Sequence, residues 1–361
     1  MTALAGLRIG LVGPLPPPAG GMAMQTRQLA ELLRGEHAEV LLVPTNAAYR
    51  PAWIAGWRGL RAFFRLVPYL LALWRAAGRI DVMHVMANSG WSWHLFTAPA
   101  VWIGRARRVP VVVNYRGGEA AEFLQRSARL VRATMQRASR LVVPSRFLHE
   151  VFARHRMAAE VVPNIVDLQR FCPAVPVAGA QLIVARNLEP IYDNATALRA
   201  FAQVRGALPQ ARLLVAGTGP EEGALKRLAA ELGIADAVEF AGRLERDVMA
   251  RRLRDSHVAI NPSLADNMPN SVLEALASGV PVVSTRVGGV PYIVEDGETA
   301  LLVPPRDPAA MAQAVLRLLR EPALAARLRA AGLRSVAAYA WSAVGPLWAA
   351  VYRQALAQER P

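Results

Sequence analysis

The sequence predicts an α/β protein made of two doubly wound, Rossmann-like domains. Short apolar runs, typical of buried parallel strands, alternate with stretches of helical periodicity, and this alternation is the pattern of such a fold. An irregular segment that carries prolines, residues 164–180, interrupts the alternation once, after which it starts again. With 361 residues, 53% of them hydrophobic, the chain is long enough for two domains that each have a core.

The first domain is expected to cover residues 1–170 and the second residues 175–341, with a hinge near residues 164–179 and a cleft between the halves. A C-terminal helix, about residues 342–361, could pack back on the first domain. Open parallel sheets bind their ligands outside the carboxyl ends of the strands. We therefore look for functional residues in the loops that follow strands.

Six strands are predicted in each domain. In the first domain they are Leu7–Val12, Glu39–Val43, Asp81–Met86, Val109–Asn114, Arg140–Val143 and Glu160–Val162, with a helix over Met22–Arg34 after a Gly/Pro loop. In the second domain they are Gln181–Ala185, Arg212–Ala216, Val238–Ala241, His257–Asn261, Val280–Ser284 and Ala300–Val303. The helices expected between them are Asn194–Arg205, Glu221–Leu232 and Ser271–Ser278, and further helices follow from about Pro308.

The composition limits the classes of protein to consider. The single cysteine, Cys172, excludes a disulfide framework and a thiolate metal site, and it fits a reducing compartment. No apolar leader precedes the first strand, and no apolar run is long enough to span a membrane. We therefore expect a cytoplasmic location, with peripheral attachment to the inner face of the cell membrane left open.

The net charge of +15 comes almost wholly from arginine, because Lys226 is the only lysine. A strongly basic chain attracts phosphorylated substrates, anionic membranes or nucleic acids. Nucleic acid is the weaker option, since the chain has no zinc finger, no aromatic RNA-binding signature and no basic low-complexity tail.

Residues 50–79 mix six aromatic side chains with arginines, as in a helix that lies in the lipid interface. The alternative is a pair of helices, split near Pro68, that pack on the first domain's sheet. Both interpretations stay open, and they are compatible if one face of the helices packs in the core and the other lies on lipid. An anionic membrane surface is therefore one candidate partner.

The most informative stretch is residues 261–297, which places two carboxylates, Asp266 and Glu274, at a junction between a loop and a helix. Pro269 suits the first turn of that helix. Glu274 would lie about one turn inside the helix, and Asp266 in the loop before it, so that both can face one crevice. The alternative is a solvated loop acid and an ordinary helix-surface glutamate.

Two glycine-containing loops precede helices. In the loop from Gly13 to Gln25, Gly20 and Gly21 come directly before a helix start, where backbone N–H groups and the helix dipole favour an anion. Gly217 and Gly219 form a similar loop before the helix that begins near Glu221. Neither loop has the spacing that indicates a nicotinamide cofactor. A simple tight turn is the alternative at both places.

Two arginines follow predicted strands directly. Arg186, with Asn187, could make a bidentate contact with a diphosphate. Arg116 lies in the stretch NYRGG that begins at Asn114, at the edge of the first domain. In so arginine-rich a chain, a plain surface arginine is the alternative for Arg186. No metal-ligand spacing and no serine-hydrolase elbow is present, so that neither a metal site nor a cofactor is expected.

Over nearly its whole length the sequence resembles the retaining glycosyltransferases of family four, also described as glycosyl transferases group 1. The motifs that carry the resemblance are GPLPPPAGG at 13–21, DVMHV at 81–85, VVPNIVDLQRF at 161–171, LLVAGTGP at 213–220, VEFAGRL at 238–244 and the block 261–297. The last is the most specific, because the family's signature is two glutamates with seven residues between them. The resemblance implies the two-domain GT-B fold.

The resemblance also implies roles for the acidic block. Glu274 would hold the ribose of the nucleotide, and Asp266 would contact hydroxyls of the donor sugar. Backbone groups would help Asp266, namely those of Asn267, Met268 and Pro269.

Phosphate contacts follow from the same resemblance. Asn270 and Ser271 would meet the phosphates at the helix start, and Arg186 would neutralise the diphosphate leaving group. Gly20 and Gly21 would approach the donor and help to shape the acceptor site.

The chain departs from the family pattern at three places. The first acid is Asp266 rather than glutamate, which shortens it by one methylene. The lysine usual shortly after the arginine is absent, and Tyr192 stands about where it would fall. The histidine usual after the strand 109–114 is replaced by the NYRGG stretch, in which Arg116 could supply the missing charge. Gln25, Asn114 and Arg116 are candidates for acceptor or phosphate contacts.

We therefore expect a retaining, metal-independent hexosyltransferase. The donor would be a nucleotide-diphosphate sugar, favoured to be UDP-linked, and the acceptor a hydroxyl group on a lipid-linked or cell-envelope polysaccharide intermediate. Two alternatives remain: a nucleotide-sugar epimerase of similar fold, and a non-catalytic nucleotide-sugar-binding protein with a degenerate site.

Overall fold

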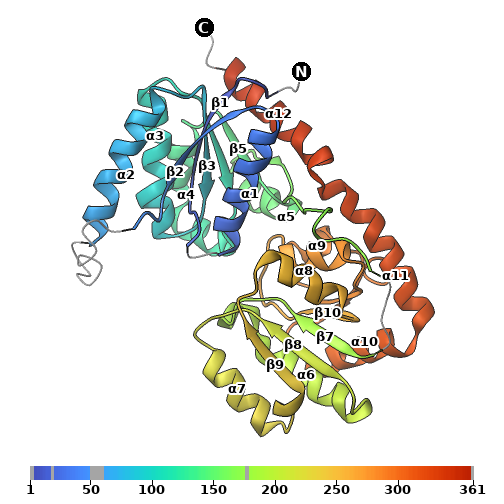
Figure 1. The fold of residues 1–361 in the computed structure, drawn as a ribbon. Coiled ribbons are helices and arrows are strands. Elements are labelled where there is room, and N and C mark those ends of the chain that lie inside the picture. Colours follow the sequence, from blue (N-terminus) through green and yellow to red (C-terminus); the bar gives the residue numbers. More distant parts are fainter. Residues whose placement is uncertain (1–3, 18–19, 49–60, 175–178, 359–361) are drawn as a thin grey trace. The chain divides into compact units, whose positions relative to one another are not determined.

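The computed structural model describes residues 4–17, 20–48, 61–174 and 179–358. The chain divides into two compact units, one formed by residues 1–164 with 341–361 and the other by residues 165–340 (Figure 1). Each unit is a six-stranded, wholly parallel sheet with helices on its faces. This confirms the predicted fold class, two doubly wound α/β domains.

The first unit has the strand order β2-β1-β3-β4-β5-β6. Its strands are β1 (Arg8–Gly13), β2 (Glu39–Pro44), β3 (Val82–Ala87), β4 (Val111–Tyr115), β5 (Arg140–Val143) and β6 (Glu160–Val161). Its helices are α1 (Gly21–Gly35), α2 (Arg61–Ala77), α3 (Ala98–Ala106), α4 (Ala120–Met135), α5 (Arg146–Arg154) and α12 (Trp341–Ala357), with a π-helical turn η2 (Trp93–Thr97) before α3. The order changes direction between β1 and β3, so that loops after these two strands meet at a topological switch point.

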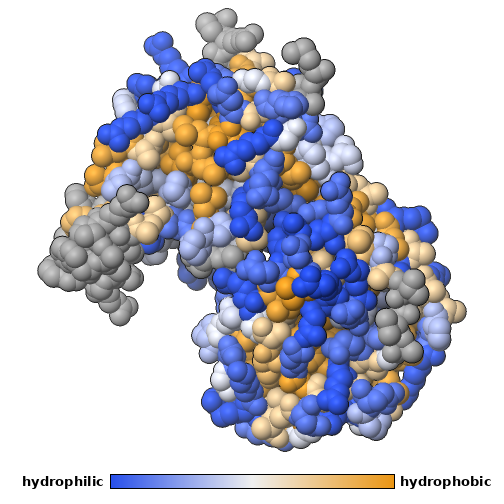
Figure 2. Space-filling view, viewed as in Figure 1, coloured by the Kyte–Doolittle hydropathy of each residue, from blue (hydrophilic) through white to orange (hydrophobic). Residues whose placement is uncertain are grey.

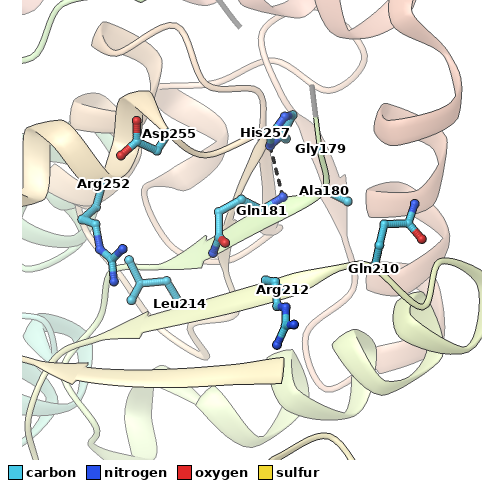
Figure 3. Close-up of a pocket in the computed structure, with 9 residues that line it drawn as sticks. All are labelled: Gly179, Ala180, Gln181, Gln210, Arg212, Leu214, Arg252, Asp255 and His257. Atoms are coloured by element: carbon cyan, nitrogen blue, oxygen red, sulfur yellow. Dashed lines mark hydrogen bonds between the residues drawn. The ribbon is translucent and has the colours of Figure 1, made fainter. Parts of the chain in front are cut away.

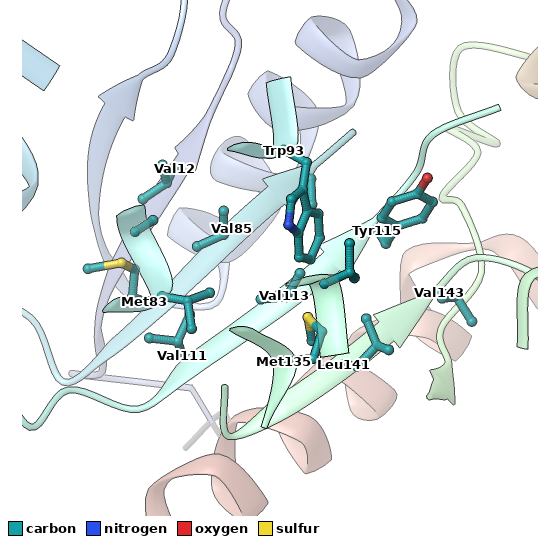
Figure 4. Close-up of a cluster of buried hydrophobic side chains, with 14 of the residues drawn as sticks. Val12, Met83, Val85, Trp93, Val111, Val113, Tyr115, Met135, Leu141 and Val143 are labelled. Atoms are coloured by element: carbon teal, nitrogen blue, oxygen red, sulfur yellow. The ribbon is translucent and has the colours of Figure 1, made fainter. Parts of the chain in front are cut away.

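Every residue of β3 and β4 is buried, because helices cover both faces of the sheet. Alternate strand residues such as Met83, Val85, Val111 and Val113 form one apolar cluster with Trp93 and residues of α2, α3 and α4 (Figure 4). Residues of opposite parity, such as His84, point to the other face, where α12 contacts β3 and β4.

The C-terminal helix α12 belongs to the first unit. Its Tyr352 hydroxyl lies 2.8 Å from His84 Nδ1, and Trp348 stacks on Tyr352. At the start of α12, the Trp341 indole donates a hydrogen bond of 2.9 Å to Glu36. Burial lowers the pKa of His84 to about 3, so that this histidine is neutral and serves as a core residue.

Helix α2 differs from the expected pair of helices. It runs through Pro68 without a break. Pro68 is exposed, so that water can take the place of the hydrogen bond that a proline removes from the helix. The first part of the aromatic and basic stretch, residues 50–60, lies outside the described residues. No helix in the described ranges is long and apolar enough to cross a membrane.

The second unit has the strand order β12-β11-β10-β7-β8-β9. Its strands are β7 (Gln181–Val184), β8 (Arg212–Ala216), β9 (Val238–Gly242), β10 (Val258–Asn261), β11 (Val282–Thr285) and β12 (Leu301–Val303). Its helices are α6 (Asn194–Ala207), α7 (Glu222–Glu231), α8 (Arg246–Arg254), α9 (Asn270–Ala277), α10 (Pro308–Arg320) and α11 (Pro322–Ser335), with short 3-10 turns η3 (Pro190–Tyr192), η4 (Ala235–Ala237), η5 (Val290–Tyr292) and η6 (Val336–Tyr339). The strand order changes direction between β7 and β10, which places the switch point of this unit between them.

Candidate functional site

The candidate site of the second unit lies at its switch point. Strand β7 ends at Val184, and Arg186 follows two residues later. Strand β10 ends at Asn261, and its loop carries Asp266 before α9 begins at Asn270. Because β7 and β10 are parallel neighbours, their carboxyl ends meet at one edge of the sheet, and residues 80 positions apart come together there.

Arg186 is the centre of this group. Its guanidinium forms an ion pair with Asp266, and the two side chains are only 11% and 13% exposed. The same guanidinium donates a hydrogen bond of 3.3 Å to the Ser271 hydroxyl and lies 4.1 Å from the centre of the Tyr192 ring. This cation is therefore held by Asp266, Ser271 and the Tyr192 ring, and its buried Nε–H has no partner.

The stacking of Arg186 on Tyr192 was not predicted from the sequence. Tyr192 ends the turn η3, and the loop after β10 is tied to that turn because Leu264 N–H donates to the Ile191 carbonyl over 2.8 Å. Tyr192 stands where the family pattern has a lysine. An aromatic face attracts a guanidinium but brings no positive charge of its own. Tyr192 therefore holds the Arg186 guanidinium in place but does not supply the second positive charge that the family pattern has at this position.

The loop that carries Asp266 is shaped by Gly288 and Gly289, which the sequence analysis did not assign to the site. Gly289 N–H donates a hydrogen bond of 2.8 Å to the Asp266 carbonyl. A Cβ at Gly288 would collide with the Asp266 carbonyl, and one at Gly289 with the Asn267 carbonyl. Only glycine permits this close approach of the two loops. A Gly-Gly pair after a strand, 22 residues beyond Asp266, is a signal that could have pointed to it.

Glu274 lies one turn inside α9 and is partly buried. Among the described residues, none donates a hydrogen bond to its carboxyl group. Burial raises its pKa to about 7, against a smaller lowering by Arg246, while Asp167 adds to the increase. This carboxyl is a strong acceptor that lacks a donor, as expected for a group that binds hydroxyls of a ligand.

The other residues of the block occupy the start of α9. Pro269 is the residue before the helix, and no side chain caps its first N–H groups. Asn270 and Ser271 are its first two residues, and they lie at the positive end of the helix dipole, which attracts an anion. The side chains of Asn267 and Met268 are buried, which leaves only their backbone for ligand contact.

Packing within the protein explains Gly217 and Gly219. A Cβ at Gly217 would collide with the Arg186 carbonyl, and one at Gly219 with the Leu188 carbonyl. These glycines let the loop after β8 pack against the segment that carries Arg186, and Leu188 N–H donates to the Thr218 carbonyl over 3.1 Å. Asn187 is exposed beside them, and its amide donates to Glu189 over 3.3 Å.

In the first unit, Gly20 and Gly21 begin α1. Gly20 has φ −80°, and an added Cβ at either glycine would meet no atom of the protein within 4 Å. Neither backbone conformation nor packing within the described residues requires glycine here. The open space beside this helix start is suited to the close approach of a ligand.

Gln25 and Arg116 lie together in the first unit. The Arg116 guanidinium donates to Gln25 on α1 and, over 2.5 Å, to Asn164. Burial lowers the pKa of Arg116 to about 10, so that it remains a cation near neutral pH. Its Nε is buried without a hydrogen-bond partner. Arg116 thus has donor capacity in reserve.

Asn114, predicted as a ligand contact, lies in the core instead. It is the fourth residue of β4, not part of the loop after it, and its side chain is fully buried. Its amide contacts His84 Nε2 at 3.1 Å and the sulfur of Met86 at 3.5 Å. Both faces of this strand are covered, so that the Asn114 side chain is enclosed by core residues, and its Oδ1 is buried without a hydrogen-bond partner.

A pocket of about 390 Å³ lies elsewhere on the second unit (Figure 3). Its lining residues Gln181 and Arg212 begin β7 and β8, so that it opens at the amino edge of the sheet, opposite to Arg186. His257 in this pocket accepts a hydrogen bond of 3.1 Å from the Gln181 N–H, which indicates a structural role. In the described ranges no group of His, Cys, Asp and Glu could hold a metal ion.

Two family models match the chain. The model of Glycosyltransferase Family 4 matches residues 19–170, and the model described as Glycosyl transferases group 1 matches residues 181–321. The D-inositol 3-phosphate glycosyltransferase of Acidothermus cellulolyticus is 33% identical over 66% of this chain. Matches to this and two similar relatives span only 53% to 61% of those proteins. The phosphatidyl-myo-inositol mannosyltransferase of Mycobacterium leprae is 26% identical over 96% of both chains.

Solved structures share the fold. The sucrose-phosphate synthase of Thermosynechococcus elongatus matches with a TM-score of 0.79 and 21% identity, over 97% of this chain and all of that one. HepE of Anabaena, in complex with UDP, matches with a TM-score of 0.75 and 17% identity, over 96% of this chain and all of that one. The two family models cover both units, and the switch-point site lies within the second model. The chain therefore belongs to the glycosyltransferases of family 4 and group 1, with the GT-B fold.

Proposed function

We propose that this protein is a retaining glycosyltransferase that moves a sugar from a nucleotide-diphosphate sugar, favoured to be a UDP-sugar, to a hydroxyl acceptor. The observation that carries the proposal is the juxtaposition of Arg186, the start of α9 and Glu274 at the switch point of the second sheet. This edge is where open parallel sheets bind nucleotides. The relatives named as glycosyltransferases of inositol phosphate and phosphatidylinositol support a phosphorylated or lipid-linked hydroxyl acceptor.

In this mechanism, Arg186 and the N–H groups of Asn270 and Ser271 receive the diphosphate. The charge that develops on the leaving diphosphate is met by a cation held at fixed geometry and by the positive end of α9, which is electrostatic stabilisation without reorganisation. These groups supply the positive charge that a metal ion supplies in other transferases, so that we propose a metal-independent reaction.

The carboxyl groups orient the donor. Glu274, once ionised, accepts hydrogen bonds from the ribose hydroxyls, and Asp266 accepts them from the donor sugar. Diphosphate and Asp266 both attract Arg186, whose unused Nε allows it to contact both. The acceptor hydroxyl attacks on the face from which the diphosphate leaves, and a donor phosphate oxygen takes its proton, which retains the anomeric configuration.

The test measures release of nucleoside diphosphate from a panel of nucleotide-sugars. Arg186→Gln is expected to lower the rate by roughly a hundredfold or more, because it removes a cation that is held in place to stabilise the leaving diphosphate. Arg199→Gln, an exposed arginine on α6, is the matched control and should leave the rate unchanged. Binding of nucleotide-sugars without turnover, for every donor and in the presence of alcohol acceptors, would contradict the proposal and favour a non-catalytic binding protein.

A further inference from the structure

The outer face of α2, α3 and α4 in the first unit exposes large apolar side chains. Helix α2 packs against α3, and α3 against α4, so that the three form one layer on the sheet. The exposed fractions are 50% for Leu71, 48% for Trp74, 47% for Trp102 and 65% for Leu130. In Figure 2, apolar residues gather on the part of the first unit where α2 and α3 lie, with hydrophilic residues along the border. We call this face the α2–α4 surface.

The charges on this surface have one sign. Residues 66–79 and 98–108 contain five arginines and no Asp or Glu. Helix α4 and the turn after it add four arginines, at 126, 129, 132 and 137, against a single acid, Glu122. On the second unit, by contrast, exposed basic side chains form ion pairs on the helix surfaces, such as Lys226 with Glu222 and Arg317 with Glu321. Among the described residues, no ion pair joins an acid to these arginines, so that the positive charge of the α2–α4 surface is not neutralised locally.

Two arginines lie on the exposed indoles. The guanidinium of Arg107 lies 4.8 Å from the Trp74 ring centre, and that of Arg137 lies 4.0 Å from the Trp102 ring centre. Such pairs place an apolar ring and a cation at the same level of the surface. Tryptophan and arginine together suit the boundary between lipid headgroups and acyl chains.

We propose that the α2–α4 surface binds the face of a bilayer that contains anionic phospholipids. Arginine without acidic neighbours complements lipid phosphates, and the exposed indoles and leucines gain by leaving water. A nucleic acid would use the arginines but would leave Leu71 and Leu130 in water. The inference does not depend on the glycosyl transfer proposed above, because no residue of the switch-point site takes part in it. It extends the membrane contact considered for residues 50–79 to α3 and α4.

The test measures sedimentation of the full chain with vesicles of phosphatidylcholine alone and with vesicles that contain about one third phosphatidylglycerol. Binding should require the anionic lipid and weaken as salt rises. The variant Arg107→Gln/Arg137→Gln should bind these vesicles roughly tenfold more weakly than the parent, because each basic residue contributes to the attraction by the anionic surface. The variant Arg320→Gln/Arg334→Gln, with the same loss of charge on α10 and α11, is the control and should bind as the parent does.

A second measurement identifies the surface that touches lipid. Brominated acyl chains quench tryptophan near the headgroups, and Trp74→Phe/Trp102→Phe should lose most of that quenching while its circular dichroism and its release of nucleotide from donor stay as in the parent. Equal binding of the two arginine variants would overturn the proposal. Equal binding to neutral and anionic vesicles would overturn it as well. A third contradicting outcome is that no vesicle binding is seen and the parent forms a dimer that Arg107→Gln/Arg137→Gln abolishes.

Discussion

Ionisation of Glu274 should make the protein less stable as the pH rises, while it produces the carboxylate that binds a ligand. Its pKa is raised from 4.5 to about 7 by burial in the folded chain. A raised carboxyl pKa means that the folded state holds the proton more tightly than the unfolded state. The contribution of Glu274 to the free energy of unfolding is therefore greatest below about pH 4.5, and it is lost as the pH rises towards 7. The shift of about 2.5 units corresponds to about 3 kcal/mol at pH 8.

Glu274→Gln removes this cost, since glutamine is neutral at every pH. The free energy of unfolding of the variant, relative to the parent, should rise by about 2.5 kcal/mol between pH 5 and pH 8. Urea unfolding of both proteins at each pH, monitored with a spectroscopic probe in the second unit, measures this difference in free energy. If the difference between variant and parent is the same at pH 5 and pH 8, Glu274 does not ionise in this range with a raised pKa.

The same ionisation should govern nucleotide binding. With a pKa of about 7, the ionised fraction of Glu274 rises about tenfold between pH 6 and pH 8. Affinity of the parent for UDP should rise by up to that factor, because the carboxylate accepts ribose hydroxyl bonds. Glu274→Gln should bind UDP more weakly than the parent at pH 8 and lack that gain. The affinities are measured by calorimetry for both proteins at each pH. Ionisation of UDP itself affects both proteins alike, so that the comparison of parent and variant removes it.

Three further predictions concern the site. Tyr192→Leu should lower the affinity for UDP relative to that for UMP, because it releases the Arg186 guanidinium. Tyr192→Phe keeps the aromatic face and should leave the ratio of the two affinities unchanged, as measured by fluorescence titration. Gly289→Ala should lower stability by roughly 1–3 kcal/mol in urea unfolding, since the new methyl group meets the Asn267 carbonyl. Arg116→Ala should lower donor affinity or turnover if its unused Nε serves the phosphates, and unchanged steady-state kinetics would reject that role.

The strand pattern made the fold predictable. The apolar runs of β3, β4, β7 and β10 are buried on both faces, which is why they stand out in the sequence without alternation. Arg186 and Asp266 could be placed at one sheet edge for the same reason, since each lies in the loop that follows a parallel strand.

What could not be predicted depends on contacts between distant segments. The stacking of Tyr192 on Arg186 and the packing of Gly288 against Asp266 arise only once the loops after β7, β10 and β11 are brought together. Asn114 was predicted as a ligand contact because it ends the predicted strand 109–114, but the observed strand runs one residue further, to Tyr115, and both of its faces are covered. Inside β4, Asn114 lies opposite Met86.

The anomeric configuration of the product decides whether this protein is a retaining glycosyltransferase. Real-time NMR of the anomeric proton, during transfer from the preferred nucleotide-sugar to an alcohol acceptor, should show the configuration of the donor retained, with one nucleoside diphosphate released per bond formed. The signal should disappear in Arg186→Gln and persist in Arg199→Gln. An inverted product, or transfer that does not need Arg186, would contradict the account.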